Sequence, residues 1–232
     1  MERREYVESR PSWEKEYGTY DSKLGFIGEQ ISLMLQYAAL DSKSLRVLDF
    51  GCAYGMHLRF LKQLNPGLEL YGVEVARQAA EAARRIVGEG NIFWQTCGDQ
   101  VPLADCSLDV IFSFDMIEHI SDHNGLKKMA AEMQRLLKPD GVAFVETPNY
   151  NRRMRWLHRL TGQGHMLKYD HCNLFDERRL RGLLEPKLNV RSVIHRGLFD
   201  PGLHVPLIRG IFSPKLYLSS HICAVCGKQA ST

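Results

Sequence analysis

Small residues follow the first apolar segment of the chain in a pattern that suits a ligand bound by the backbone. Gly51, Ala53 and Gly55 alternate directly after the expected strand Val47–Phe50. Glycine lets a backbone turn tightly and approach a ligand with no Cβ in the way. The helix expected over Met56–Leu64 would begin at the same place and present unpaired N–H groups there. The pattern therefore predicts a site for a nucleotide-like cofactor.

A carboxylate stands where such a cofactor would need one. Glu74 lies at the end of the next apolar segment, which we expect to be a strand over Leu68–Val75. An acid at the carboxyl end of the second strand can accept two hydrogen bonds from a ribose diol. An ordinary exposed acid at a strand end is the alternative. We interpret Glu74 as the ribose contact, with Val75 beside it.

Two cofactors compete for the loop after the first strand. A dinucleotide fingerprint needs glycine at its first, third and sixth positions, which are Gly51, Ala53 and Met56 here. Met56 would obstruct the close helix–strand packing that the third glycine permits. The loop instead resembles the Asp-x-Gly-x-Gly-x-Gly loop of class I S-adenosylmethionine-dependent methyltransferases, with Ala53 in place of the middle glycine. This resemblance implies S-adenosylmethionine as the cofactor, with these loop contacts: Asp49, Gly51, Cys52, Ala53 and Gly55.

A later stretch matches the adenine-binding part of the same family. The strand expected over Asn91–Cys97 leads into Gly98, Asp99 and Gln100, and in the family this Gly-Asp stretch frames the adenine. The resemblance implies Asp99 and Gln100 as adenine contacts. An aspartate that only forms a turn is the alternative for Asp99.

Two further motifs extend the resemblance. The segment 107–119 is similar to the family signature Ser-Phe-Asp-x-Val…Leu-Glu-His-Val, which implies that Phe114 lies beside the methionine end of the cofactor. The turn Leu137–Gly141 is similar to Leu-Lys-Pro-Gly-Gly, with Asp140 in place of one glycine. The resemblance covers about residues 45–147 closely and 169–195 more loosely. It points to the broad bacterial small-molecule group of type 11 and type 23 methyltransferases, which includes quinone-biosynthesis O-methyltransferases.

The expected elements favour one fold class. Strands and helices alternate over 45–147, which favours a mostly parallel sheet with helices on both faces. The resemblance implies an α/β fold, a doubly wound and mostly parallel seven-stranded sheet of the Rossmann-like methyltransferase type, whose last strand is antiparallel. We also expect helices over Ile31–Leu40, Leu126–Lys138 and Asp176–Glu185, and strands over Val142–Thr147, Leu188–His195 and Leu216–Val225.

The chain is expected to form one domain with appendages. Residues 1–28 are charged and aromatic and are predicted as an N-terminal helical arm, and residues 29–232 as the methyltransferase domain. The arm could fold across the cofactor and acceptor or simply pack on the sheet. Segments of about 149–168 and 197–214 break the pattern and are predicted as acceptor-side insertions.

Two histidines are candidates for the chemistry at the acceptor. Methyl transfer from a sulfonium needs alignment of the reacting atoms and a dry site. A hydroxyl acceptor also has to lose its proton, which suits a histidine near neutral pH. His171 lies in a segment similar to the family's His-x-x-x-Phe entry into a helix, where Asp170 could orient it, and we predict His171 as the general base. His119 follows the fourth strand and is the second catalytic candidate. Packing or substrate binding remains open for His171, and a structural role for His119.

A basic segment lies on the expected acceptor side. Arginines and a histidine crowd residues 149–168, with Trp156 among them. Such a run is most often a solvated helix face. Alternatively, it recognises an anionic acceptor such as a phosphate or carboxylate, with Trp156 stacking on a ring. The residues concerned are Arg152, Arg153, Arg155, His158 and Arg159.

Composition excludes several classes of protein. A net charge of +3 over 232 residues does not demand nucleic acid or an anionic membrane. Residues 1–10 lack the apolar core of a secretory leader, and no run approaches the roughly 18 apolar residues of a spanning helix. Six scattered cysteines, expected to be reduced, favour the cytoplasm. His221, Cys223 and Cys226 are half a zinc site at best, and alternation along a strand explains them without a metal.

These observations predict an S-adenosylmethionine-dependent methyltransferase that acts on a small-molecule acceptor, with a hydroxyl oxygen as the first choice of methylated atom. Transfer to nitrogen or a carboxylate would also be consistent with the class. Outside it, the same residues leave open an RNA methyltransferase and a non-catalytic module that only binds S-adenosylmethionine. No Asn/Asp-Pro-Pro-Tyr/Phe motif follows the fourth strand, so we expect no DNA partner.

Overall fold

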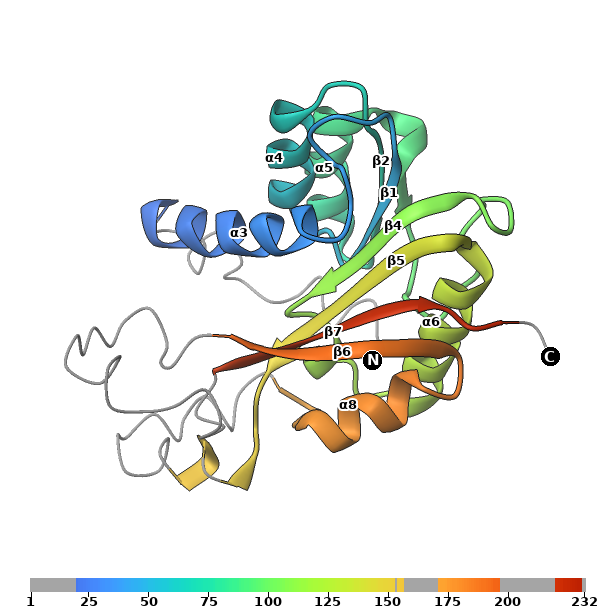
Figure 1. Ribbon diagram of the computed structural model, residues 1–232. Coiled ribbons are helices and arrows are strands. Elements are labelled where there is room, and N and C mark those ends of the chain that lie inside the picture. Colours follow the sequence, from blue (N-terminus) through green and yellow to red (C-terminus); the bar gives the residue numbers. More distant parts are fainter. Residues whose placement is uncertain (1–19, 153, 157–170, 197–219, 231–232) are drawn as a thin grey trace.

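A computed structural model describes residues 20–152, 154–156, 171–196 and 220–230 (Figure 1). Seven strands form one sheet in the order β3-β2-β1-β4-β5-β7-β6. β7 runs antiparallel to both of its neighbours, and the other pairs are parallel. The strands are β1 Arg46–Phe50, β2 Glu69–Glu74, β3 Ile92–Trp94, β4 Leu108–Phe114, β5 Leu137–Pro148, β6 Leu188–Arg196 and β7 His221–Lys228.

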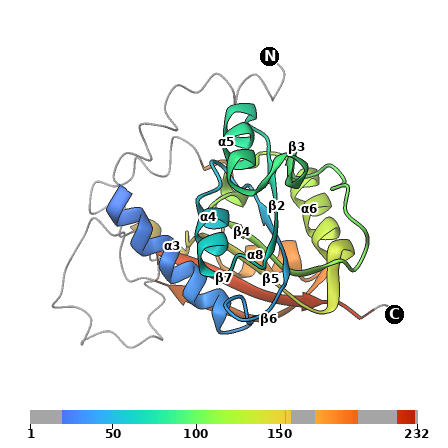
Figure 2. The same ribbon diagram turned by 90° about the horizontal axis from the view of Figure 1, so that it is seen from above.

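Helices cover both faces of the sheet (Figures 1 and 2). α3 Tyr20–Leu35, α4 Met56–Leu64 and α5 Arg77–Val87 lie on one face, and α6 His123–Leu136 and α8 Glu177–Leu184 lie on the other. Two short 3₁₀ turns, η1 Glu89–Asn91 and η2 Ile117–His119, connect strands to helices. The predicted α/β, doubly wound seven-stranded sheet with an antiparallel last strand is therefore confirmed. In the described part of the chain, no helix combines the length and the apolar character that crossing a membrane requires.

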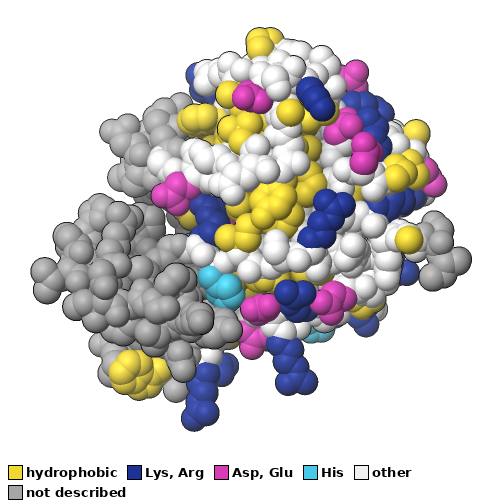
Figure 3. Space-filling view, viewed as in Figure 1, with side chains coloured by type: hydrophobic (Ala, Val, Ile, Leu, Met, Phe, Trp, Pro, Cys, Tyr) yellow, Lys and Arg dark blue, Asp and Glu magenta, His cyan; other side chains and the backbone are white. Residues whose placement is uncertain are grey.

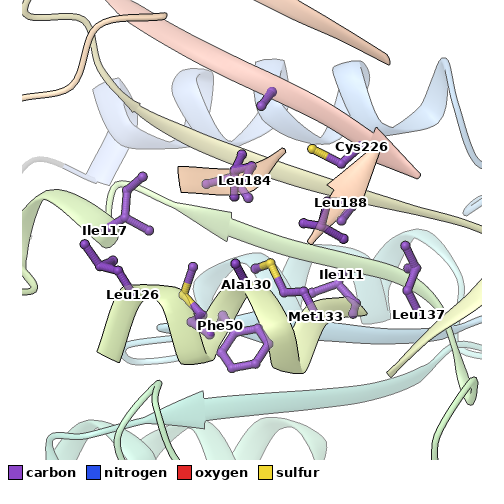
Figure 4. Close-up of a cluster of buried hydrophobic side chains, with 14 of the residues drawn as sticks. Phe50, Ile111, Ile117, Leu126, Ala130, Met133, Leu137, Leu184, Leu188 and Cys226 are labelled. Carbon is purple, nitrogen blue, oxygen red and sulfur yellow. The ribbon is translucent and has the colours of Figure 1, made fainter. Parts of the chain in front are cut away.

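Alternating side chains divide the core into two layers. On β1, Val47 faces the layer beneath α3, α4 and α5, while Leu48 faces the layer beneath α6 and α8. On β7, Cys223 lies in the first layer and Cys226 in the second. The strand alternation that we expected for these two cysteines is confirmed. Ten residues of the second layer are labelled in Figure 4: Phe50, Ile111, Ile117, Leu126, Ala130, Met133, Leu137, Leu184, Leu188 and Cys226.

Several expected boundaries were wrong. The helix expected over Ile31–Leu40 is α3, which begins at Tyr20 and ends at Leu35, because the buried stripe of Ile27, Ile31 and Met34 extends the amphipathic pattern upstream. The boundary predicted after residue 28 therefore falls inside a helix.

At the other end of the chain, the last strand begins at His221 and continues to Lys228, beyond the expected end at Val225, because it pairs with both β5 and β6 over its whole length. The third strand is shorter than expected and ends at Trp94. The helix expected over Leu126–Lys138 is α6, which begins at His123.

The turn expected over Leu137–Gly141 lies inside β5, at a shift of register against β4. Gly141 is needed there, because a Cβ would lie 2.8 Å from Cδ1 of Leu137. The arm before residue 20 and most of the two expected insertions lie outside the described residues.

The strand order reverses at β1: β2 and β3 are added on one side of it and β4 and β5 on the other, and the parallel strands β1 and β4 end side by side. Open α/β sheets bind ligands at such a switch point. The glycine loop follows β1 and the histidine-bearing turn η2 follows β4, so the fold brings both predicted parts of the site to this edge.

Candidate active site

The loop after β1 is a tight turn that depends on its small residues. Gly51 (φ 86°), Ala53 (φ 45°) and Gly55 (φ 76°) all have left-handed backbone conformations, which glycine adopts without strain. The N–H of Gly51 donates to the carbonyl oxygen of Val73 at 2.8 Å, which holds the loop against β2. A Cβ at Gly51 would clash with Cγ of Met116. The glycine loop therefore packs directly on the loop after β4.

Glu74 ties the glycine loop to the end of β2. Its Oε2 accepts a hydrogen bond from the N–H of Ala53 at 2.9 Å, and its Oε1 accepts one from the N–H of Ala76 at 2.7 Å. Burial raises the pKa of Glu74, while these backbone hydrogen bonds lower it. Each carboxylate oxygen keeps a second lone pair. The side chain can therefore hold the loop and still accept hydrogen bonds from a ligand.

Asp49 places a second carboxyl group beneath the same loop. The residue is 2% exposed, and its Oδ2 has no hydrogen-bond partner within the described structure. Burial, followed by the nearby charge of Glu74, raises the pKa of Asp49 well above its usual range. A buried oxygen without a partner is unfavourable unless a ligand supplies a donor.

The other predicted cofactor contacts surround this loop less closely. Asp99 is exposed, and its Oδ2 accepts a hydrogen bond from the N–H of Thr96 at 3.0 Å. Asp99 therefore stabilises a turn, which was the alternative to a contact with adenine. Gln100 is also exposed. The carbonyl oxygen of Val75 accepts from Nε1 of Trp94 at 2.9 Å, which fixes the chain just after Glu74.

Phe114 and its neighbours form an aromatic wall that the sequence did not reveal. The Phe114 ring lies 5.4 Å from the ring of His57, and Phe114 is 7% exposed. Nε2 of His57 is 2.7 Å from Oε1 of Gln30 on α3. Burial lowers the pKa of His57 to about 4, so this imidazole is neutral at physiological pH.

Three carboxyl groups gather at the carboxyl ends of β4 and β5. Glu146 is paired on both oxygens, by Nε2 of Gln30 at 2.6 Å and by Nη1 of Arg196 at 2.8 Å. Oδ1 of Asp115 lies 3.5 Å from Nε2 of His221. Burial raises the pKa of Asp115 to about 7, against the opposing influence of Arg196 and Gln30. The third carboxyl group is that of Glu118.

Glu118 is almost completely buried, at 1% exposure. Its Oε2 accepts from Oγ1 of Thr147 at 3.0 Å, but its Oε1 has no hydrogen-bond partner within the described residues. Burial raises the pKa of Glu118 well above its usual range, and the charge of Asp115 raises it further. Glu118 belongs to the same sequence motif as His119. The periodicity of the sequence does not indicate that the Glu118 side chain is buried beside the two histidines.

The two predicted catalytic histidines meet beside Glu118. Nε2 of His119 lies 4.0 Å from Oε1 of Glu118, and the rings of His119 and His171 are 4.9 Å apart and edge-on. Nδ1 of His171 contacts the hydroxyl of Tyr150. The N–H of Asn173 donates to the carbonyl oxygen of Glu118 at 2.9 Å, which docks the His171 segment on the β4 loop. Asp170, the expected orienting residue, lies outside the described residues.

One side-chain atom each from Glu118, His119 and His171 lies within 4.8 Å of the others. Within the described part of the chain, this is the one group of metal-ligating side chains gathered so closely. The three atoms could hold a metal ion or another cation.

The described arginines of the basic segment face solvent. Arg152 and Arg155 are exposed, and Trp156 is 63% exposed, while Arg153 and residues 157–170 lie outside the described residues. On the face shown in Figure 3, acidic and basic side chains are interspersed over the described surface. The described arginines of this segment therefore behave as a solvated face.

Comparison with known proteins agrees with this geometry. A family model described as a methyltransferase domain matches residues 22–186. A ubiquinone biosynthesis O-methyltransferase from Mesorhizobium japonicum is 27% identical over 159 residues, which cover 61% of this chain and 62% of that protein. The enzyme of the same name from Idiomarina loihiensis is 31% identical over 129 residues, covering 53% and 49%. The chain thus spans about half to three-fifths of the length of these relatives.

Solved structures share the fold at low sequence identity. A protein from Pyrococcus horikoshii superposes with a TM-score of 0.68 at 16% identity, covering 97% of this chain and 99% of that one. A geranyl diphosphate C-methyltransferase from Streptomyces coelicolor, solved with S-adenosyl-L-homocysteine, superposes with a TM-score of 0.60 at 14% identity, covering 87% and 79%. Because the family model spans well over half of its length, the chain belongs to the methyltransferase domain family, as a class I S-adenosylmethionine-dependent methyltransferase (EC 2.1.1.-).

Proposed function

We propose that the chain transfers the methyl group of S-adenosylmethionine to a hydroxyl oxygen of a small molecule, and that His171 removes the proton of this hydroxyl. The curated relatives named above are O-methyltransferases, which supports oxygen as the acceptor atom. The observation that carries the proposal is the contact between the two loops. Met116 packs over Gly51, so the loop with His119 lies directly against the glycine loop.

The described residues fit the donor that the family uses. The Oδ2 of Asp49, buried beneath the glycine loop and without a partner among the described residues, can accept from an ammonium group of the donor. Glu74 would accept from the ribose hydroxyls with its remaining lone pairs. When bound, S-adenosylmethionine supplies a methyl group on a sulfonium, which is already a good leaving group. We propose the other contacts as Cys52, Ala53, Gly55, Val75, Asp99, Gln100 and Phe114.

The chain's own task is then to position the acceptor and take its proton. His171 is held by Tyr150 through Nδ1, and this contact can fix the orientation of the ring. A base whose orientation is fixed in this way removes a proton efficiently. His119 lies edge-on to His171, which suits a role in shaping the site.

The decisive experiment uses S-adenosylmethionine with a labelled methyl group and a panel of small-molecule phenols, alcohols, amines and carboxylates. We expect label in an O-methylated product and stoichiometric release of S-adenosyl-L-homocysteine. Label on nitrogen or a carboxylate would refute transfer to oxygen, and binding of the donor with no transfer to any acceptor would favour a non-catalytic module.

His171→Ala tests the base. We expect turnover to fall at least about a hundredfold, the usual contribution of a general base, with affinity for S-adenosyl-L-homocysteine unchanged. His123→Ala is a matched control, because His123 is an exposed histidine at the start of α6 that has no proposed role in the reaction. Full turnover in His171→Ala would remove this residue as the base.

A further inference from the structure

Within the described residues, three carboxyl groups gather at one end of the site, and Arg196 and His221 pair with two of them. Arg196 pairs with Glu146 at 2.8 Å and with Glu29 at 3.2 Å. His221 lies 3.5 Å from Asp115. Oε1 of Glu118 has no hydrogen-bond partner among the described residues, and Nε2 of His119 lies 4.0 Å from it. This distance is too long for a hydrogen bond.

Burial makes the unpartnered oxygen informative. A buried carboxyl group without a partner is unfavourable, and buried charges in proteins are normally paired. Glu118 is 1% exposed and makes one side-chain hydrogen bond, through its other oxygen. The rise in the pKa of Glu118 has the same origin, burial beside another acid. A bound cation would donate the missing hydrogen bond to Oε1 and would also favour the charged form of the Glu118 carboxyl group.

The spacing of the three atoms indicates which kind of cation fits. An ammonium nitrogen donates hydrogen bonds of about 2.8 Å in tetrahedral directions, so its acceptors lie about 4.6 Å apart. Ligands of Zn²⁺ or Mg²⁺ lie at about 2.1 Å, which puts neighbouring ligand atoms only about 3.0–3.4 Å apart. The atoms of Glu118, His119 and His171 lie within 4.8 Å of one another, and the Glu118–His119 distance is 4.0 Å. At 4.0 Å, Oε1 of Glu118 and Nε2 of His119 lie farther apart than neighbouring ligands of such a metal, and a small widening would suit an ammonium.

We infer that the methyl acceptor is a small molecule that carries a protonated amine, and that Glu118 and His119 hold its ammonium group beside His171. The carboxylate oxygen of Glu118 accepts one N–H and a neutral ring nitrogen of His119 accepts another, while the ring nitrogen of His171 that does not face Tyr150 takes the proton of the hydroxyl. This assignment rests on the proposed function, because it places the acceptor at the histidines beside the glycine loop. Which atom of the acceptor is methylated is a separate matter, answered by the position of the label in the product.

The amine differs in charge from the anion that the basic segment suggested. Arg152 and Arg155 are exposed, whereas the buried acids surround the point where the acceptor would lie. Charges act most strongly where water is excluded. The interior of the site therefore selects a cation, and the described arginines of the segment face solvent.

The test uses methylammonium chloride as the probe, titrated into the full chain saturated with S-adenosyl-L-homocysteine. The ring signals of the histidines are followed by NMR, with sodium chloride at equal ionic strength as the blank. His119→Gln and His171→Gln assign the two signals. We expect saturable shifts of the His119 and His171 signals, with binding at least about tenfold weaker in Glu118→Gln, since a charge-assisted hydrogen bond is lost.

Glu69→Gln is the matched control, because Glu69 is an exposed acid at the amino end of β2 and should leave the shifts unchanged. If Glu118→Gln does not fold, His119→Gln removes a second acceptor atom and should weaken binding in the same direction.

Two results would overturn the inference. One is the lack of any saturable shift with methylammonium in the wild-type chain. The other is saturation of the same signals by Zn²⁺ or Mg²⁺ with exclusion of methylammonium, which would make this a metal site. Calorimetry with S-adenosyl-L-homocysteine, run beforehand, tests the donor site separately and so distinguishes failure of the proposed function from failure of the amine assignment.

Discussion

At the scale of single residues, Glu74 has two tasks that its contacts explain. Its two oxygens accept from backbone N–H groups on both sides of the site, at Ala53 and Ala76. The same side chain is the proposed partner of the ribose. Loss of the carboxylate would therefore loosen the glycine loop and remove the sugar contact together.

We expect Glu74→Ala to abolish measurable binding of S-adenosyl-L-homocysteine while the chain still folds. The two backbone donors left behind would cost about 1–3 kcal/mol of stability each if they stayed buried, so the unfolding free energy should also fall. Calorimetry gives the affinity and circular dichroism the fold. Affinity equal to that of the wild-type chain would contradict the assignment of the donor pocket.

His57 gives a prediction about pH. Its pKa is lowered from 6.5 to about 4, so the unfolded chain binds more protons than the folded chain between these values. The contribution of His57 is present above pH 6.5 and is lost as the pH falls toward 4. We expect the stability difference between wild type and His57→Gln to shrink by about 2 kcal/mol from pH 7 to pH 4.5.

Urea unfolding of both proteins at the two pH values measures this difference. The comparison with the variant is essential, because Asp115 has a raised pKa of about 7 and titrates in the opposite sense. The folded chain holds that proton up to about pH 7, so its stabilising effect is lost as the pH rises. A difference that does not change with pH would mean that His57 is not buried as a neutral ring.

Sequence reasoning reached some of these residues and not others. The small residues of the loop and Glu74 could be predicted because local motifs fix their places after β1 and β2. Gln30 and His57 could not, because their pairing joins α3 to α4 across 27 residues and leaves no periodic trace. Glu118 was visible only as part of a motif, and its burial depends on how the β4 loop folds back.

At the scale of elements, α3 is fastened to the sheet through buried and exposed polar contacts. Gln30 donates to Glu146 on β5, and Arg196 on β6 pairs with both Glu146 and Glu29. Arg196 also lies over the ring of Phe26, at 5.6 Å. The attachment of α3 to the sheet therefore depends on Arg196, which also neutralises the fully buried Glu146.

We expect Arg196→Met to lower the free energy of unfolding by about 3–5 kcal/mol, because it leaves Glu146 buried without its cation. Glu29→Gln removes only the exposed half of the network and should change stability by no more than about 0.5 kcal/mol. Urea unfolding at neutral pH compares the two. Equal small effects would show that Glu146 does not need Arg196.

The bounds of a helix or strand could be predicted where clear signals in the sequence mark both of its ends. α4 has the bounds that the sequence predicted, because a glycine turn starts it and a polar residue, Asn65, follows it. α3 was misplaced because its upstream turns carry fewer apolar residues. β7 was misplaced because it is buried on both faces, so alternation between apolar and polar residues does not mark its ends.

At the scale of the whole molecule, donor binding should stabilise the fold, since the loops proposed to contact the donor follow β1, β2 and β4. We expect S-adenosyl-L-homocysteine at a hundredfold excess over its Kd to add about 2.7 kcal/mol to the unfolding free energy. For a chain of 232 residues this raises Tm by roughly 5–10 °C. Thermal unfolding measures the shift. NADH is the control, and stabilisation by NADH in place of S-adenosyl-L-homocysteine would contradict the choice of cofactor.

The architecture as a whole was predictable because motifs of one family occur in order along 45–147. The acceptor was not, since its recognition depends on segments that match no motif and on buried charges that meet only in three dimensions. Asp115 follows β4, Glu118 lies in η2 and Glu146 lies on β5, and no motif in the sequence indicates that they come together.

Met116 has a consequence for how such a protein can change over time. Its side chain fills the space over Gly51, so the loop proposed to hold the donor packs directly against the loop that carries Glu118 and His119. A larger side chain at either position would displace both loops. New acceptors should therefore be acquired by changes in the outer segments, while the contact between Met116 and Gly51 is retained.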